Sequence, residues 1–360
     1  MFDTKEPELY RFSERIQAWG LSIRRVVATE RIRSVVEALP GPRNRLYQPE
    51  AMEKADSMII EQLTNSGWLP EKQPFSYSNI KALRDISPLL LNENEKLKDI
   101  MMVYDRLEGS NIIAVKKGTD EPENAIVIIA HHDTVKASQG ANDNTASVAA
   151  ILELARVLGS YRFKKSVVLA MPDMEELWLL GAIALVESLV ASYKILGVIN
   201  YETMGCVDSD PGSQVVPQGI DLLYKDQYNR IKANDFKGDF TCIIYNGKAK
   251  STASMLGTAL NNLTGKQTSL YLRDPNDLPV IGKLLGILVP TVRNFARSDH
   301  SRFWDAGIPA MMVTDTANFR YKHYHQPTDT PEKVDYHRIA DIAAATATVI
   351  AETAELILNN

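Results

Sequence analysis

The chain has 360 residues, of which 45% are hydrophobic and 24% are charged, so it can bury a sizeable core without a disulfide framework. Its formal net charge of −5 argues against a nucleic-acid-binding protein and against a polybasic membrane anchor. The two cysteines, Cys206 and Cys242, exclude a cysteine-rich zinc site. The longest apolar stretch, residues 177–186, is too short to span a membrane. The charged start of the chain does not resemble a signal peptide, and we therefore expect a cytoplasmic protein.

Residues 1–45 are mostly helix-prone, and the helical pattern stops at Pro40, Gly41 and Pro42. We expect them to form a helical N-terminal extension, followed by a single α/β domain over residues 46–360. Within that domain, apolar residues at helical spacing predict a first helix over 51–63, with a stop at Gly67.

Strands and helices alternate from residue 109 onward. Buried-type apolar runs predict strands at 111–116, 125–130, 166–171, 196–200, 240–245, 289–292 and 309–314, and helical spacing predicts helices at 146–158, 180–190 and 337–358. This alternation is typical of an α/β fold, and we expect a mixed, mostly parallel central sheet with helices on both faces. The stretch 205–300 is less regular and predicts a lid or subdomain over the site.

Imidazole and carboxylate groups follow the predicted strands, at what would be one edge of the sheet. They are His131 and Asp133 after the strand at 125–130, Asp143 in the next loop, Glu175 and Glu176 after the strand at 166–171, Glu202 after the strand at 196–200, and His325 near the end of the chain. Each alone has an ordinary explanation; residues 142–144, for example, read as a turn and helix cap. Their joint occurrence predicts a metal site.

Imidazole and carboxylate ligands together suit zinc, and also manganese or cobalt. Two such ions need a bridging carboxylate and about two further protein ligands each. A set of five residues meets this need: His131, Asp143, Glu176, Glu202 and His325. Glu175 is then left unbound beside the metals, as a general base requires, and Asp133 can orient the imidazole of His131.

The sequence resembles the family-28 metallopeptidases, the co-catalytic zinc group that includes bacterial leucyl aminopeptidases and glutamate carboxypeptidase. The resemblance covers residues 111–341 approximately. It rests on five motifs, which are His131-His132-Asp133, Gly140-Ala141-Asn142-Asp143-Asn144, Glu175-Glu176, Ser298-Asp299-His300 followed by Gly307-Ile308-Pro309, and His325-Gln326-Pro327-Thr328-Asp329-Thr330.

This resemblance implies two zinc ions, one held by His131 and Glu202 and the other by Glu176 and His325, with Asp143 bridging them. It implies metal-assisted hydrolysis of an amide, in which Glu175 takes a proton from the attacking water and gives it to the leaving amine. The family more often has aspartate at position 202; glutamate reaches one methylene further and can still bind a metal.

The predicted function is that of an exopeptidase, most simply an aminopeptidase, acting on a peptide or small amide, with no nucleic-acid or membrane partner. Candidate substrate contacts are Asp299, His300, Tyr324 and Arg297; the arginine could clamp a carboxylate. A homo-oligomer is possible, and the sequence does not decide the oligomeric state.

Three alternatives remain at this stage. The first is a glutaminyl-cyclase-like transferase with one zinc, against which the His131–Asp133 pair argues because it supplies a second metal site. The second is a non-catalytic member of the family, against which the complete set of ligands argues. The third is an amidohydrolase with a specialised small-molecule or dipeptide substrate, on which the sequence is silent.

Overall fold

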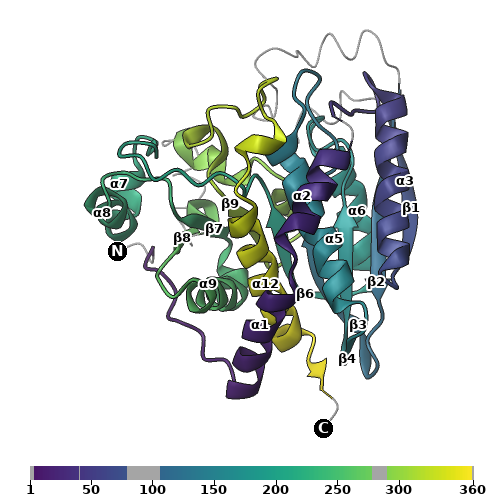
Figure 1. Cartoon of the computed structure of the whole chain (residues 1–360), viewed down its shortest axis with the longest axis horizontal. Helices are drawn as coiled ribbons and strands as arrows, with labels where there is room; N and C mark the ends of the chain where they lie inside the picture. Colours follow the sequence, from purple (N-terminus) through teal and green to yellow (C-terminus); the bar gives the residue numbers. More distant parts are fainter. Residues whose placement is uncertain (1–3, 40, 79–105, 278–289, 359–360) are drawn as a thin grey trace.

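A computed structural model describes residues 4–39, 41–78, 106–277 and 290–358 (Figure 1). Within these residues one eight-stranded sheet runs through the molecule in the order β1-β2-β5-β3-β6-β9-β7-β8. The central strands β5, β3, β6 and β9 are parallel, whereas β2 pairs antiparallel with β5 and β7 antiparallel with β9. The strands are β1 (Leu69–Ser78), β2 (Arg106–Lys116), β3 (Glu121–Ile129), β5 (Lys165–Met171), β6 (Lys194–Tyr201), β7 (Thr241–Tyr245), β8 (Ser269–Arg273) and β9 (Ala310–Thr314). The predicted α/β class is confirmed.

Helices cover both faces of this sheet (Figure 1). Alternate residues of β3 explain why, since Ile126 and Ile128 belong to one core cluster and Val127 and Ile129 to the other. The first cluster packs under α1, α2, α3, α5, α9 and α12, and the second under α6 and α11. These helices are α1 (Glu14–Val26), α2 (Thr29–Ala38), α3 (Pro49–Asn65), α5 (Ala146–Leu158), α6 (Leu180–Ser192), α9 (Lys250–Thr264), α11 (His300–Asp305) and α12 (Tyr336–Thr353).

The N-terminal helices are part of the larger core. Trp19 and Ile23 of α1 and Ile32 and Val36 of α2 are buried in the same cluster as the helices that cover the sheet. Helix α1 lies against α12, and α2 lies against α5 (Figure 1). Residues 1–45 were predicted to form a helical extension; α1 and α2 within it are helical, and each packs an apolar face against the main core cluster. Pro40, one of the expected helix stops, lies outside the described residues.

The stretch 205–300 contains β7, which corresponds to the strand predicted at 240–245, and also α9 and β8, which were not predicted. Strands β7 and β8 extend the sheet beyond β9. The irregular part that remains includes the short helices α7 (Ile220–Leu223) and α8 (Lys225–Ala233) and a 3-10 helix at Pro290–Ala296. Residues 290–292 of the strand predicted at 289–292 belong to this 3-10 helix, so that prediction is wrong for them. Val289 lies outside the described residues. Proline has no N–H to donate to a strand ladder, which favours the helical turn.

Two further differences occur at the edges of the sheet. Strand β1 was not predicted, because its sequence carries Pro70 and Pro74; an edge strand tolerates both. The closing helix was predicted over 337–358, but α12 ends at Thr353. Glu355 has φ +55°, and a right-handed helix cannot continue through a residue in this conformation. The chain then forms β10 (Leu356–Ile357), which pairs with β4 (Arg162–Phe163). Among the described helices, none combines the length and apolarity needed to cross a membrane.

The burial of α2 can be tested by truncating one side chain. Ile32 is completely buried in the main cluster. We expect Ile32→Ala to lower the free energy of unfolding by about 2–5 kcal/mol through lost burial and a residual cavity. Glu37→Ala, at an exposed position of the same helix, is the control and should change it by less than about 0.5 kcal/mol. Urea denaturation measures both, and equal effects would contradict the packing of α2 as core.

Candidate metal centre

The carboxyl ends of three parallel strands bring the predicted ligands together. His131 follows β3, Glu176 follows β5, and Glu202 follows β6 directly. Asp143 lies in the turn at Ala141–Thr145 that opens α5, and His325 lies in the long loop between β9 and α12. The five side chains thus come from five places in the chain and meet at one edge of the sheet.

These residues form two clusters that share Asp143. In the first, the Nε2 atom of His131 lies 3.3 Å from Oδ1 of Asp143 and 3.3 Å from Oε2 of Glu202. In the second, the Nε2 atom of His325 lies 3.1 Å from Oδ2 of Asp143 and 3.3 Å from Oε2 of Glu176. The ligand atoms within each cluster lie within 4.8 Å of one another. Each oxygen of Asp143 therefore faces a different histidine, as a bridging carboxylate requires.

The buried atoms of these clusters fit a metal ion. Nε2 of His131, both carboxylate oxygens of Asp143 and Oε1 of Glu176 are buried and make no hydrogen bond to any residue that the structure describes, despite their closeness to one another. Native structures rarely leave buried polar atoms unsatisfied without a reason such as a bound ion. Imidazole nitrogen together with carboxylate oxygen is a donor set that zinc accepts.

Burial also changes the proton affinities of the site. It raises the pKa of Glu176 to about 7, although His325 beside it works in the opposite direction. Burial raises the pKa of Glu175 well above its usual value, opposed by His131 and reinforced by Glu202. Burial lowers the pKa of His325, but Glu176 and Asp143 outweigh burial and raise it to about 10. The clustered carboxyls thus favour bound positive charge, whether protons or a metal cation.

Glu175 borders both clusters. Its Oε2 atom lies 3.9 Å from Nε2 of His131, and it also groups with His131 and Glu176 within 4.8 Å. Only 7% of its surface is exposed. A nearly buried carboxyl beside the ligands is placed to hold a proton for chemistry at the centre.

Asp133 joins two of the turns that carry candidate ligands. Its Oδ1 atom accepts a hydrogen bond from the backbone N–H of Glu175 (3.0 Å), and its Oδ2 accepts from that of Glu176 (3.2 Å). Oδ1 also lies 3.5 Å from Nδ1 of His131, which is 3.2 Å from the backbone oxygen of Asp133. The sequence indicated the contact with His131, but the two backbone contacts depend on the fold.

Asp329 is a positioning residue that the site prediction missed. Its carboxylate accepts hydrogen bonds from the backbone N–H groups of Asn142 (2.8 Å) and Asp143 (3.1 Å) and from the hydroxyl of Tyr321 (2.7 Å). It therefore holds the turn that presents Asp143. The available signal was its place in the motif that begins at His325.

The same turn requires glycine at position 140. Gly140 has φ +67°, and a Cβ there would lie 2.3 Å from Cγ2 of Thr134.

The four predicted substrate contacts have different surroundings. His300 is fully buried, its Nε2 is 2.8 Å from the backbone oxygen of Phe295, and burial lowers its pKa to about 4. Asp299 is fully buried, and neither of its carboxylate oxygens makes a hydrogen bond; burial raises its pKa to about 8. Tyr324 and Arg297 line a cavity next to Glu202. The ring of Tyr324 stacks on that of His325 at 3.8 Å, and Arg297 donates a hydrogen bond to Asn318.

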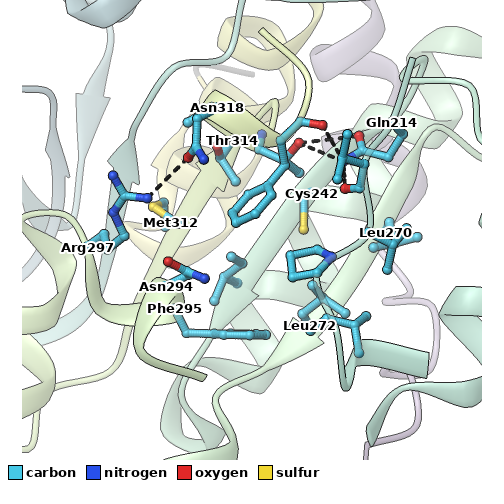
Figure 2. Close-up of a pocket in the computed structure, with 18 of the residues that line it drawn as sticks. Gln214, Cys242, Leu270, Leu272, Asn294, Phe295, Arg297, Met312, Thr314 and Asn318 are labelled. Carbon is cyan, nitrogen blue, oxygen red and sulfur yellow. Dashed lines mark hydrogen bonds between the residues drawn. The ribbon is translucent and has the colours of Figure 1, made fainter. Parts of the chain in front are cut away.

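The cavity has a volume of about 820 Å³, which includes space open to solvent (Figure 2). The sequence did not predict it. Its walls come from β7, β8 and β9, from the segment around α7 and α8, and from the 3-10 helix at Pro290–Ala296. Apolar side chains dominate the lining, among them Val216, Ile220, Phe240, Ile244, Leu270, Leu272, Phe295, Met312 and Phe319. Because Glu202 lines it as well, an apolar group in the cavity lies beside the first cluster.

Comparisons with known proteins identify the family of the chain. The sequence profile of peptidase family M28 matches residues 111–239 and 283–350, which is more than half of the chain. The uncharacterized protein YfbL of Escherichia coli K12 is 31% identical over 255 residues, covering 67% of this chain and 70% of that protein. A probable zinc metalloprotease of Leptosphaeria maculans is 26% identical over 244 residues, covering 63% of this chain and about half, 51%, of that protein.

Solved structures share the fold at low sequence identity. The aminopeptidase from Aneurinibacillus sp. strain AM-1 superposes with a TM-score of 0.64 at 17% identity, over 93% of this chain and 96% of that one. The glutaminyl cyclase of Fimbriiglobus ruber superposes with a TM-score of 0.59 at 16% identity, over 96% and 97%. Together with the profile match and the zinc-metalloprotease relatives, these findings place the chain in peptidase family M28, as a metallopeptidase hydrolase.

Proposed function

We propose that this protein is a two-zinc exopeptidase that removes the N-terminal residue of a peptide, with a preference for large apolar residues. The observation that carries the proposal is the carboxylate of Asp143, whose two oxygens face His131 and His325 in two separate clusters. A second set of ligands sharing one carboxylate is what a pair of ions requires.

In this proposal His131 and Glu202 hold one ion, Glu176 and His325 hold the other, and Asp143 binds both. When bound, the ions would polarise the scissile carbonyl and make water a stronger acid. Asp133 keeps the imidazole of His131 and the turn of Glu175 in place through its contacts to both.

Glu175 is the proposed general base. It accepts the proton of the attacking water and passes it to the leaving nitrogen, so that the peptide C–N bond breaks and a free amine departs. Its nearness to both clusters supports this role.

The surroundings of Glu202 support the choice of substrate. On one side lies the apolar cavity, which suits a large hydrocarbon side chain next to the scissile carbonyl. On the other side, the charge of Glu202 helps to raise the pKa of Glu175 and the pKa of Asp299. Such a group of carboxyls favours the amino group of a peptide N-terminus.

Metal content and one substitution test the proposal. We expect elemental mass spectrometry to find about two zinc ions per chain. We also expect the protein to hydrolyse leucine p-nitroanilide. Glu175→Gln should retain both ions and lose about 10²–10⁴-fold in kcat, because the base is removed while the ligands stay. Glu187→Gln, at an exposed position of α6, is the matched control and should behave as the parent.

Other results would point elsewhere. One ion per chain with cyclisation of an N-terminal glutamine would favour the transferase alternative, and absence of bound metal would favour a non-catalytic protein.

The apolar cavity predicts a dependence on side-chain size. Leucine p-nitroanilide should exceed the alanine compound in kcat/KM by about 10–100-fold, because each buried methylene contributes roughly 0.8 kcal/mol. Val216→Trp should narrow the cavity and reduce this ratio. Val190→Trp, at an exposed position of α6, is the control and should leave the ratio unchanged. A parent enzyme that prefers aspartate or lysine p-nitroanilide would contradict the assignment of the cavity.

The metal-free protein should become less stable as the pH rises. Burial raises the pKa of Glu176 from 4.5 to about 7. A carboxyl whose pKa is higher in the folded chain than in the unfolded chain stabilises the fold at low pH, and this contribution is lost as the pH rises from about 4.5 to about 7. In EDTA, Glu176→Gln should therefore melt at a higher temperature than the parent at pH 8, with little difference at pH 5. With zinc present at pH 8, the order should reverse; a variant that is less stable than the parent in EDTA at pH 8 contradicts the prediction.

A further inference from the structure

The short segment 43–45, between α2 and α3, reaches the candidate metal centre. It lies outside the residues that match the family profile. Arg43 is completely buried, and the side chain of Arg45 is only 10% exposed. Two buried arginines beside a group of buried carboxylates are unusual enough to require a physical explanation.

Arg43 connects the two turns that present His131 and Asp143. Its backbone exchanges hydrogen bonds with Thr134, whose hydroxyl accepts from the N–H of Arg43 (2.9 Å) and whose N–H donates to the Arg43 carbonyl (2.8 Å). Its guanidinium donates from Nε to the backbone oxygen of His132 and from Nη2 to Oγ1 of Thr145 (2.9 Å). One rigid planar group thus spans the end of β3 and the turn before α5.

The charge of Arg43 is placed among buried aspartates. Burial lowers the pKa of its guanidinium to about 10, while Asp133, Asp143 and Asp329 favour its charged form. It therefore carries a positive charge at neutral pH. These aspartates belong to the candidate centre, as the bridging ligand and the two carboxylates that hold its turns.

Arg45 makes the matching connection to the third turn. Its guanidinium contacts Oδ2 of Asp173 through Nε (2.6 Å) and Oδ2 of Asp56 through Nη2 (2.7 Å). Oδ1 of Asp173 in turn accepts from the backbone N–H of Met174, immediately before Glu175. The turns after β3 and β5 and the turn before α5 are therefore all tied to residues 43–45.

We propose that Arg43 is a positioning and charge-balancing residue of the metal centre, supplied by a segment outside the matched family region. It holds the turns that present His131 and Asp143 in fixed relative positions. Its positive charge compensates the negative charge of the aspartates that would surround the metals. The proposal rests on metal binding as proposed above, but not on peptide cleavage.

If Arg43 balances charge, its removal should affect the Tm of the metal-free protein differently from the Tm of the metal-loaded protein. Without zinc, Arg43 supplies positive charge beside Asp133, Asp143 and Asp329, and His131 and His325 also compensate Asp143. Bound zinc would compensate Asp143 further. Arg43→Met should therefore lower the Tm in EDTA more than the Tm with saturating zinc, and the zinc-induced rise in Tm should exceed that of the parent by several degrees. A residue with a merely structural role would lower both temperatures equally.

Arg43→Lys separates charge from geometry. Lysine keeps the positive charge, so the zinc-induced rise in Tm should return to nearly the parent value. A single ammonium cannot reproduce the planar fork that joins His132 and Thr145. The kcat of the lysine variant should therefore be about ten-fold lower than that of the parent, and its KM should change by less than about three-fold. Thr145→Val, which removes one partner of the fork and no charge, should show the same pattern and remains informative if Arg43→Met does not fold.

The matched control is Arg24→Met, which removes a partly buried ion pair with Asp341, away from the centre. It should lower the two Tm values equally and leave kcat unchanged. Equal losses in the two states for Arg43→Met, or full kcat in both Arg43→Lys and Thr145→Val, would overturn the proposal. A parent that binds zinc without cleaving any anilide overturns only the peptidase assignment, because the comparison of Tm values still applies.

Discussion

The carboxylate of Asp143 is the group on which the candidate centre depends. Its two oxygens are buried, make no hydrogen bond and lie 3.3 Å from His131 Nε2 and 3.1 Å from His325 Nε2. A carboxylate in this condition is costly unless a cation compensates it. Much of the nearby structure serves to hold it there: Asp329 binds its backbone N–H, and Arg43 binds the threonine that ends its turn.

Two environments of opposite character meet at Glu202. Toward the centre lie the other carboxyls, whose mutual closeness favours protons or metal ions, and Ser298 donates a hydrogen bond to the Oε2 atom of Glu202 (2.8 Å). Toward β7, β8 and β9 lies the apolar cavity (Figure 2). The arrangement follows from the sheet, because Glu202 directly follows β6, while β9, β7 and β8 on one side of β6 line the cavity. In the proposed function, bond cleavage and side-chain recognition would thus lie next to each other.

Sequence reasoning worked best where periodicity and strand ends coincide. Strand β3 is recognisable because it is apolar on both faces, and the residues that follow it then fall at the sheet edge. It worked least well for segments whose burial depends on distant partners. Helices α1 and α2 look like an extension, since nothing in their composition reveals that α12 and α5 cover them. Strand β7 was predicted at 240–245, whereas β8, in the otherwise irregular stretch 205–300, was not predicted.

The sequence by itself determined the α/β class, the five candidate ligands and the candidate base, because strand pattern and residue chemistry are local properties. Only the tertiary structure decided that Asp143 stands between two histidines, that Asp133 and Asp329 bind backbone N–H groups, and that His300 is buried against the backbone of Phe295. The cavity and the role of residues 43–45 were also decided there. Arg43 and Thr145 are about a hundred positions apart, and a contact over such a separation leaves no periodic signal in one sequence.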